Sequence, residues 1–273
     1  MAGRIAQKFA SAKSQNRGIL GVFVSAGDPT EEICVATLDE LVSAGADIIE
    51  LGMPFSDPMA DGPAIQAASL RAIKAGMTLE KTLKIAADFR ERHPETPLIL
   101  MGYYNPIYMY GVDAFLAAAK QAGVDGLIVV DLPPEEDVEL CDPAIAAGLD
   151  FIRLTTPTTK GARLTRVLEK AGGFVYYVSI TGITGTKSAA ADSIQQAVTD
   201  IRAATDLPVV TGFGIRTAAQ AAEAAQISDG AIVGSAVVEI IANNIDDAGT
   251  PSPDIPQKIG QFVSELARAI AGK

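Results

Sequence analysis

The segment IIELGMPFSDPMADGP, residues 48–63, joins an apolar run to a proline-rich loop. The apolar run predicts a buried strand, and Glu50 is the one acid inside it. The three prolines that follow exclude both a helix and a central strand, so the strand must open into a stiff loop. That loop carries two more acids, Asp57 and Asp61. An ionisable group at the end of a strand, followed by such a loop, is more typical of a functional site than of a scaffold.

The same order of elements repeats along the chain. Short apolar runs predict strands at 18–25, 47–51, 97–102, 126–131, 151–156, 174–179, 207–211 and 229–234. Helical patterns lie between them, including single helices at 135–147 and 193–204, whereas 103–106 reads as a loop. The runs are continuously apolar, as buried parallel strands require, and none are close enough for a hairpin. This pattern predicts an α/β protein in which residues 1–273 form one (β/α)8 TIM barrel with extra N-terminal and peripheral helices. An open doubly wound sheet is the alternative.

Composition excludes several classes of function. The chain has 273 residues, a formal net charge of −11 and a pI near 4.6. Such an acidic protein is a poor partner for nucleic acid or for an anionic membrane surface. No run approaches the roughly 18 apolar residues of a membrane span, and the N-terminus lacks the apolar core of a signal peptide. We therefore expect a soluble, cytoplasmic protein.

Few residues in the chain could hold a metal. Cys34 and Cys141 lie inside helical patterns and are expected to be buried thiols in a reducing compartment. The single histidine, His93, reads as a solvated loop residue. With no histidine or cysteine cluster, no metal site is expected. Acid–base chemistry must then fall to carboxylates, tyrosine or lysine.

The carboxyl ends of barrel strands are where an active site is expected. Glu50, Tyr103, Asp131 and Tyr176 all stand at or near such ends. A buried acid without a partner is costly, which favours a functional role for Glu50. The alternative is a structural acid paired with a cation, and Arg153 on the fifth predicted strand is a candidate partner.

Glycines gather in the loops after the last three predicted strands. They form the segments GITG at 182–185 and GFG at 212–214, and Gly234 precedes Ser235 at the start of a helix. Glycines let backbone N–H groups approach an anion closely, and a helix N-terminus favours negative charge. These loops predict a site for a small phosphate ester.

Several segments together resemble the tryptophan synthase α subunit family. The resemblance extends from FVSAGDP at 23–29 through ELGMPFSDPMADGP at 50–63, YNP at 104–106, DLPPE at 131–135, GITG at 182–185 and GFGI at 212–215 to GS at 234–235. It implies a barrel lyase that splits indole-3-glycerol phosphate into indole and glyceraldehyde 3-phosphate by a retro-aldol reaction, with no cofactor of its own.

The resemblance also implies roles for individual residues. Glu50 would be the acid–base residue, Asp61 would accept a hydrogen bond from the indole N–H, and Tyr176 would lie near the reacting carbon. The substrate-binding residues that it implies are Phe23, Leu100, Tyr103, Thr184, Gly185, Phe213, Gly214, Gly234 and Ser235.

A partner and two moving loops follow from the same resemblance. The expected partner is a pyridoxal-phosphate-dependent tryptophan synthase β subunit in an αββα heterotetramer, with Asp57 and Pro58 facing it. Loops 53–62 and 180–191 are expected to close over the site, although Ile180 stands where many relatives have an arginine. Two other hypotheses stay open: a free-standing lyase, and a catalytically silent activator of the β subunit.

Overall fold

Parallel strands form the centre of the molecule in the computed structural model, which describes residues 3–178, 187–212 and 214–272, with 187–191 as backbone only. The sheet order is β5-β4-β3-β2-β1-β9-β8-β7-β6, with every pairing parallel. The strands are β1 (Ile19–Ser25), β2 (Ile48–Gly52), β3 (Leu98–Gly102), β4 (Gly126–Val129), β5 (Asp150–Phe151), β6 (Arg153–Thr155), β7 (Val175–Val178), β8 (Val209–Gly212) and β9 (Gly230–Val233).

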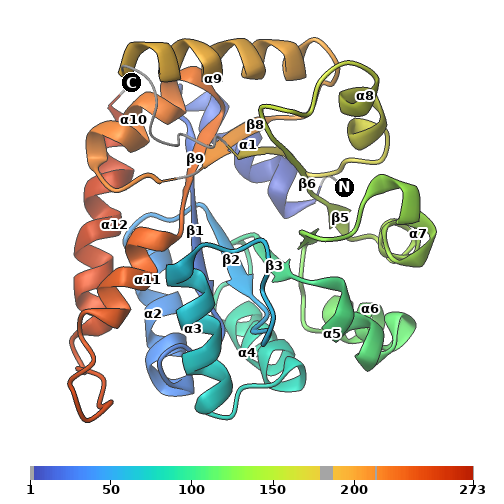
Figure 1. The fold of residues 1–273 in the computed structure, drawn as a ribbon. Coiled ribbons are helices and arrows are strands. Elements are labelled where there is room, and N and C mark those ends of the chain that lie inside the picture. Colours follow the sequence, from blue (N-terminus) through green and yellow to red (C-terminus); the bar gives the residue numbers. More distant parts are fainter. Residues whose placement is uncertain (1–2, 179–186, 213, 273) are drawn as a thin grey trace.

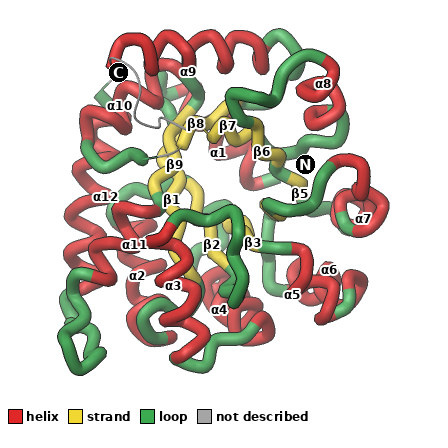
Figure 2. The backbone as a smooth tube through the Cα atoms, viewed as in Figure 1, coloured by secondary structure: helices red, strands yellow, loops and turns green. Residues whose placement is uncertain are grey.

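The sheet closes on itself through its fifth predicted strand. That strand is split at Ile152 into β5, which pairs with β4, and β6, which pairs with β7. The two ends of the sheet are therefore joined by one residue, whose N–H still donates to Leu127 O (2.9 Å). Figure 2 shows the strands following one another around a ring with helices outside it. The (β/α)8 barrel predicted from the sequence is confirmed.

Helices surround this ring, and their order can be followed in Figure 1. They are α1 (Arg4–Ser14), α2 (Glu31–Ser43), α3 (Pro63–Lys74), α4 (Leu79–Arg92), α5 (Tyr104–Tyr110), α6 (Val112–Gln121), the 3-10 helix η1 (Pro134–Glu139), α7 (Cys141–Ala146), α8 (Ala162–Leu168), α9 (Lys187–Arg202), α10 (Ala218–Ile227), α11 (Ser235–Ala242) and α12 (Ile255–Ala271). No helix in these described ranges is both long and apolar enough to cross a membrane.

Three of these elements differ from the sequence prediction. Helix α5 occupies the segment read as a loop, because the Asp131 carboxylate accepts a hydrogen bond from Tyr104 N (2.8 Å) and caps its N-terminus. The single helix predicted at 135–147 is divided into η1 and α7, since Leu140 has a non-helical φ of −146°. Helix α9 begins at Lys187, six residues before the predicted start at Ser193.

The barrel interior is an apolar layer that is closed at one end. It contains Ile19, Ile48, Ile99, Ile128, Ile152, Phe174, Val210 and Ile232. Helix α1 adds Ile5, Phe9 and Ala12 to the same cluster, and the Phe9 and Phe174 ring centroids are 5.8 Å apart. Since α1 covers the amino ends of the strands, a ligand can approach the interior only from the carboxyl ends.

Aspartates hold the strands in register at the covered end. One stands just before each of β2, β4 and β9, accepts a hydrogen bond from a backbone N–H of the neighbouring strand and pairs with an arginine. The sets are Asp47 with Leu20 N and Arg17, Asp125 with Leu98 N and Arg90, and Asp229 with Val209 N and Arg202. This repeated clamp leaves the carboxyl ends free for chemistry.

The structure excludes one alternative raised from the sequence and corrects one expectation about charged residues. Arg153 does not pair with Glu50: its buried guanidinium bonds Asp137 of η1 and donates to Leu132 O (3.2 Å). Side chains alternate along this strand: Ile152 and Leu154 face the barrel interior, so Arg153 between them faces outward. His93 is half-buried rather than solvated, with Nε2 2.7 Å from Asp39 Oδ1. The two cysteines are free and buried, as predicted.

Breaking the buried Arg153–Asp137 pair should lower the free energy of unfolding far more than breaking an exposed pair on the same segment. Arg153→Met leaves the Asp137 carboxylate buried without its main partner, which should lower the free energy of unfolding by about 3–5 kcal/mol in urea denaturation. Arg163→Met, which breaks the exposed pair with Glu135, is the matched control and should cost less than about 1 kcal/mol. Equal losses in the two variants would contradict this account of η1.

Candidate active site

Glu50 lies inside the barrel, near the carboxyl end of β2. Its register partners are Phe23 on β1 and Ile99 on β3, so its side chain shares the inner face with them. The residue is 1% exposed, and its Oε1 has no hydrogen-bond partner among the described residues. Burial in this apolar surrounding raises the pKa of Glu50 from its ordinary 4.5 to about 8. At neutral pH this carboxyl group therefore holds its proton and can donate it.

Tyr176 reaches the same interior from β7. Burial raises the pKa of its hydroxyl well above the ordinary value, and the negative charge of Glu50 raises it further. A Cβ at Gly212 would lie 2.5 Å from this hydroxyl, so only glycine at that position of β8 lets the tyrosine ring lie where it does. The hydroxyl is therefore a neutral hydrogen-bond donor in the neighbourhood of Glu50.

Asp61 stands in a different environment on the loop between β2 and α3. Burial raises the pKa of this half-buried carboxyl from 3.8 to about 6, and the Tyr103 hydroxyl opposes that rise by hydrogen bonding. Tyr103 Oη also accepts from Ala60 N (2.9 Å), Asp61 N donates to Pro58 O (3.0 Å), and Gln66 Nε2 donates to Asp61 O (2.8 Å). These bonds anchor the loop that carries Asp61.

A crevice at the carboxyl ends of β1 to β4 brings Asp61 together with apolar side chains. It is lined by Phe23, Gly52, Met53, Asp61, Ile65, Ser69, Met101, Gly102, Tyr103 and Val130. Sequence reasoning placed Phe23 and Tyr103 here, and the structure does the same. It missed Met101, which lines the crevice, and Gln66, which does not line it but bonds the backbone of Asp61.

Leu100 was the wrong residue of β3. Its side chain is fully buried in the core between the sheet and the outer helices, which also contains Leu51 and Leu127, its register partners on β2 and β4. Side chains alternate between the two faces of a strand, so the next residue, Met101, points to the crevice instead.

The expected phosphate site is described in part. Ser235 is the first residue of α11, whose N-terminal N–H groups have no partner within the helix. Gly234 precedes it as the helix N-cap, and Gly214, with φ +69°, follows β8. Thr184, Gly185 and Phe213 lie outside the described residues, as do residues 180–186 of the loop 180–191 that was expected to close over the site. The backbone of residues 187–191 belongs to helix α9.

The two residues expected to face a partner differ in exposure. Asp57 is exposed, but Pro58 is buried, and its carbonyl accepts the hydrogen bond from Asp61 N. The large exposed apolar side chain of this loop is that of the next residue, Met59, which is 78% exposed. Pro58 is thus part of the loop's own packing.

The described side chains contain no cluster of three or more histidines, cysteines or acids that could hold a metal ion. What the site offers is two carboxyl groups with separated pKa values and a neutral tyrosine, at the open end of a parallel barrel. The fold and site define a (β/α)8 barrel enzyme with acid–base side chains at the carboxyl ends of its strands.

Comparison with known proteins identifies the family. The sequence matches the family of the tryptophan synthase alpha chain over residues 9–265. The crystal structure of tryptophan synthase subunit alpha from Legionella pneumophila is 37% identical, covers 100% of both chains and superposes with a TM-score of 0.91. A chain of tryptophan synthase from M. tuberculosis is 33% identical, covers 99% of both chains and gives a TM-score of 0.86. This chain belongs to the tryptophan synthase alpha chain family, whose members are lyases that cleave indole-3-glycerol phosphate in tryptophan synthesis.

The buried state of Glu50 predicts how stability depends on pH. Because its pKa is raised in the folded protein, the penalty for burying the carboxylate grows as pH rises from about 4.5 to about 8. Glu50→Gln carries no such charge. We expect the free energy of unfolding of the variant, relative to the unaltered protein, to rise by about 4 kcal/mol between pH 5 and pH 9 in urea denaturation. A difference in unfolding free energy that stays constant over that range would show that the pKa of Glu50 is not raised.

Proposed function

We propose that Glu50 is the acid–base residue of indole-3-glycerol phosphate cleavage. The reaction places a proton on C3 of the indole ring and removes one from the glycerol hydroxyl as the carbon–carbon bond breaks. A carboxyl group with a pKa of about 8 is protonated at neutral pH, and after giving its proton to carbon it can take up the hydroxyl proton. The observation that carries this proposal is the unpartnered, buried Oε1 of Glu50.

Asp61 would take the complementary role. Its pKa of about 6 leaves it ionised at the pH at which Glu50 is still protonated. An anionic carboxylate in the crevice can accept the indole N–H and stabilise the positive charge that develops on the ring when C3 is protonated. Two carboxyl groups held in different environments divide the work in this way.

Tyr176 and the apolar lining would complete the site. The neutral hydroxyl of Tyr176 is in position to donate a hydrogen bond near the reacting atoms. Phe23 and Met101 offer apolar surface to the indole ring. The Tyr103 hydroxyl accepts a hydrogen bond from the loop that carries Asp61. Excluding water from such a crevice strengthens each electrostatic interaction inside it.

The pH dependence of cleavage should show both carboxyl groups. We expect kcat/KM to be highest between about pH 6 and pH 8, to fall below that range as Asp61 is protonated and above it as Glu50 ionises. Glu50→Gln should lower kcat by about 10²- to 10⁴-fold with little change in KM. Asp61→Asn should remove the acidic limb, whereas Asp57→Asn, on the exposed part of the same loop, should keep it. Turnover retained in Glu50→Gln would overturn the mechanism.

The substrate phosphate would bind at the N-terminus of α11. Ser235 N–H and the preceding Gly234 lie at the carboxyl end of β9, next to the loop of Gly214. Gly185 and Phe213 are the other phosphate-binding residues in this proposal, and they are included on the basis of the sequence alone.

A negative charge at position 235 tests the phosphate site. Ser235→Asp places a carboxylate where the phosphate dianion would lie, so KM should rise about tenfold or more through charge repulsion. Ser235→Ala keeps the backbone N–H and should change KM far less. An unchanged KM in Ser235→Asp would place the phosphate elsewhere.

The cognate tryptophan synthase β subunit is the partner that we propose, and the solved M. tuberculosis relative is described as tryptophan synthase. Exposed apolar side chains follow three neighbouring strands at the carboxyl face of the barrel. They are Met59 after β2 (78% exposed), Tyr108 and Met109 on α5 (61% and 74%) and Val138 on η1 (70%). Exposed apolar groups gathered on adjacent loops mark a protein interface better than Asp57 and Pro58 do. An αββα assembly in the cytoplasm remains part of this proposal.

Charge in this surface should weaken the complex. Met109→Glu should raise the Kd for the cognate β subunit, measured by titration calorimetry, by about tenfold or more. Leu70→Glu, which adds the same charge at a 45% exposed position on α3, is the control and should not. Fast indole release by the isolated chain would favour the free-standing lyase, and binding to the β subunit without any cleavage would favour the silent activator.

A further inference from the structure

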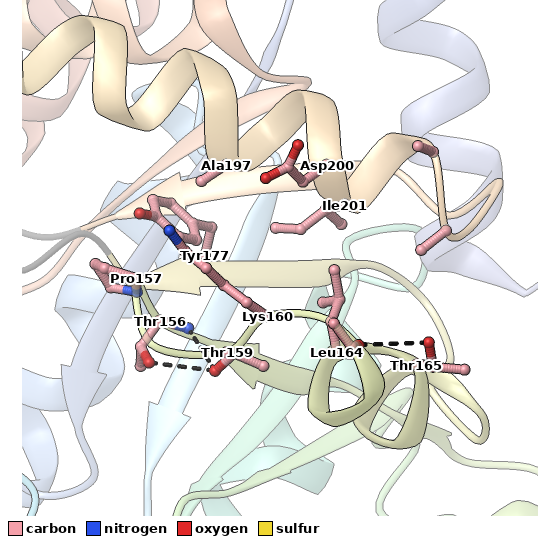
Figure 3. Close-up of a pocket in the computed structure, with 13 residues that line it drawn as sticks. Thr156, Pro157, Thr159, Lys160, Leu164, Thr165, Tyr177, Ala197, Asp200 and Ile201 are labelled. Carbon is pink, nitrogen blue, oxygen red and sulfur yellow. Dashed lines mark hydrogen bonds between the residues drawn. The ribbon is translucent and has the colours of Figure 1, made fainter.

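A second cavity lies on the outer side of the barrel, away from the crevice of Asp61. It has a volume of about 350 Å³ and opens between the segment that follows β6, helix α8 and helix α9. Figure 3 shows Leu164 and Thr165 of α8 on one side and Ala197, Asp200 and Ile201 of α9 on the other. Its volume is in the range of small-molecule sites.

The cavity has an unpartnered hydroxyl group in its wall. Tyr177 lines it, is only 2% exposed and forms no hydrogen bond with any described residue. Since side chains alternate along a strand, Tyr177 lies on the outer face of β7 while its neighbour Tyr176 lies on the inner one. Burial raises the pKa of the Tyr177 hydroxyl, so it stays neutral and can donate. The hydroxyl oxygen is not among the enclosed polar atoms that lack a partner, so it is open to the cavity and a ligand there can accept a hydrogen bond from it.

Two opposite charges stand at the cavity without ion pairs in the described structure. Lys160, exposed on the loop before α8, has no acidic partner there, and Asp200 on α9 is bonded only to Gln196 Nε2 (2.8 Å). Near Lys160, the hydroxyl groups of Thr156 and Thr159 lie 3.2 Å apart and add polar atoms to that side. One part of the cavity thus suits an anionic group and the other a cationic one.

Apolar side chains line the same cavity as these charged groups. Leu164 and Ile201 are buried residues of the core cluster that also contains Tyr177, and Ala197 packs against it. A bound molecule would therefore need an apolar body as well as both charges.

We propose that this cavity binds the zwitterion of an apolar L-amino acid. The carboxylate would contact Lys160, the ammonium group would contact Asp200, and the side chain would lie on Leu164 and Ile201. The Tyr177 hydroxyl would donate to the carboxylate. An organic acid or an amine alone would satisfy only one of the two unpaired charges, which is why a zwitterion is favoured.

Titration calorimetry of the full chain with L-phenylalanine tests this site. L-phenylalanine is chosen because it has no indole ring, so its binding is not confused with binding at the substrate crevice. We expect saturable binding, with 3-phenylpropionate, which lacks the ammonium group, and phenethylamine, which lacks the carboxylate, each at least about tenfold weaker. Lys160→Met and Asp200→Asn should each weaken the binding of L-phenylalanine by a similar factor. In Lys160→Met the preference for L-phenylalanine over phenethylamine should shrink, because only the Tyr177 hydroxyl is left to contact the carboxylate.

The matched control is Lys13→Met, which removes an exposed lysine from α1 and should leave the affinity unchanged. Lys160 is exposed too, so the urea midpoint of Lys160→Met should match that of the unaltered protein, and a weaker affinity then reports on the site. Absence of saturable binding up to about 100 times the protein concentration would overturn the proposal. So would an affinity that Lys160→Met and Asp200→Asn do not change.

Discussion

The burial of one carboxyl group without a cationic partner is the constraint on which this site depends. Glu50 stands above a layer of isoleucine side chains that fills the barrel, and α1 closes the end below it. In that surrounding the carboxylate loses most of its hydration, so the protonated form is favoured and the pKa rises. The chain also contains a buried arginine, Arg153 on β6, but its side chain faces outward and is bound to Asp137. If Arg153 were on the inner face, Glu50 would be ionised at neutral pH and could not donate a proton.

The second carboxyl group is tuned by a different structural device. Asp61 is held on a loop whose backbone is bonded to Tyr103, Pro58 and Gln66. The loop leads directly into α3, and Arg71 of α3 forms two hydrogen bonds of 2.8 Å with the buried carboxylate of Asp28 after β1. The position of Asp61 is thus linked to two neighbouring strands. Its partial burial separates its pKa from that of Glu50 while leaving it ionised in the working range.

Much of the fold could be predicted because its local signals agree with one another. Continuous apolar runs, glycines after helices and prolines after strands all indicate the same parallel barrel, and the strand that carries Glu50 was placed within one residue. What failed depended on contacts that are distant in sequence. Helix α5 requires the carboxylate of Asp131, 27 residues away, and the partners of Arg153 and His93 lie on other elements.

Most of the candidate site was predictable because its local signals agree in the same way. The prediction failed where two neighbouring residues have the same chemical character. Glu50, Asp61, Tyr103 and Tyr176 carry chemistry that stands out in an apolar context. Leu100 and Met101 are both apolar, so composition does not say which one faces inward. The register does: Gly52 on β2 is paired with Met101, and Glu50, two residues earlier on the same strand, is an inward residue. Counting by twos from Glu50 across the paired strands could have found Met101, but only with the register known.

The central claim is that Glu50 is protonated at neutral pH in the folded protein. Carbon-13 NMR of the side-chain carboxyl groups in a glutamate-labelled sample can follow its titration, with the resonance assigned by its loss in Glu50→Gln. The account predicts a midpoint near pH 8, far from those of the exposed glutamates. A midpoint near 4.5 would contradict it, because the buried carboxyl would then be ionised and its role as the proton donor would fail.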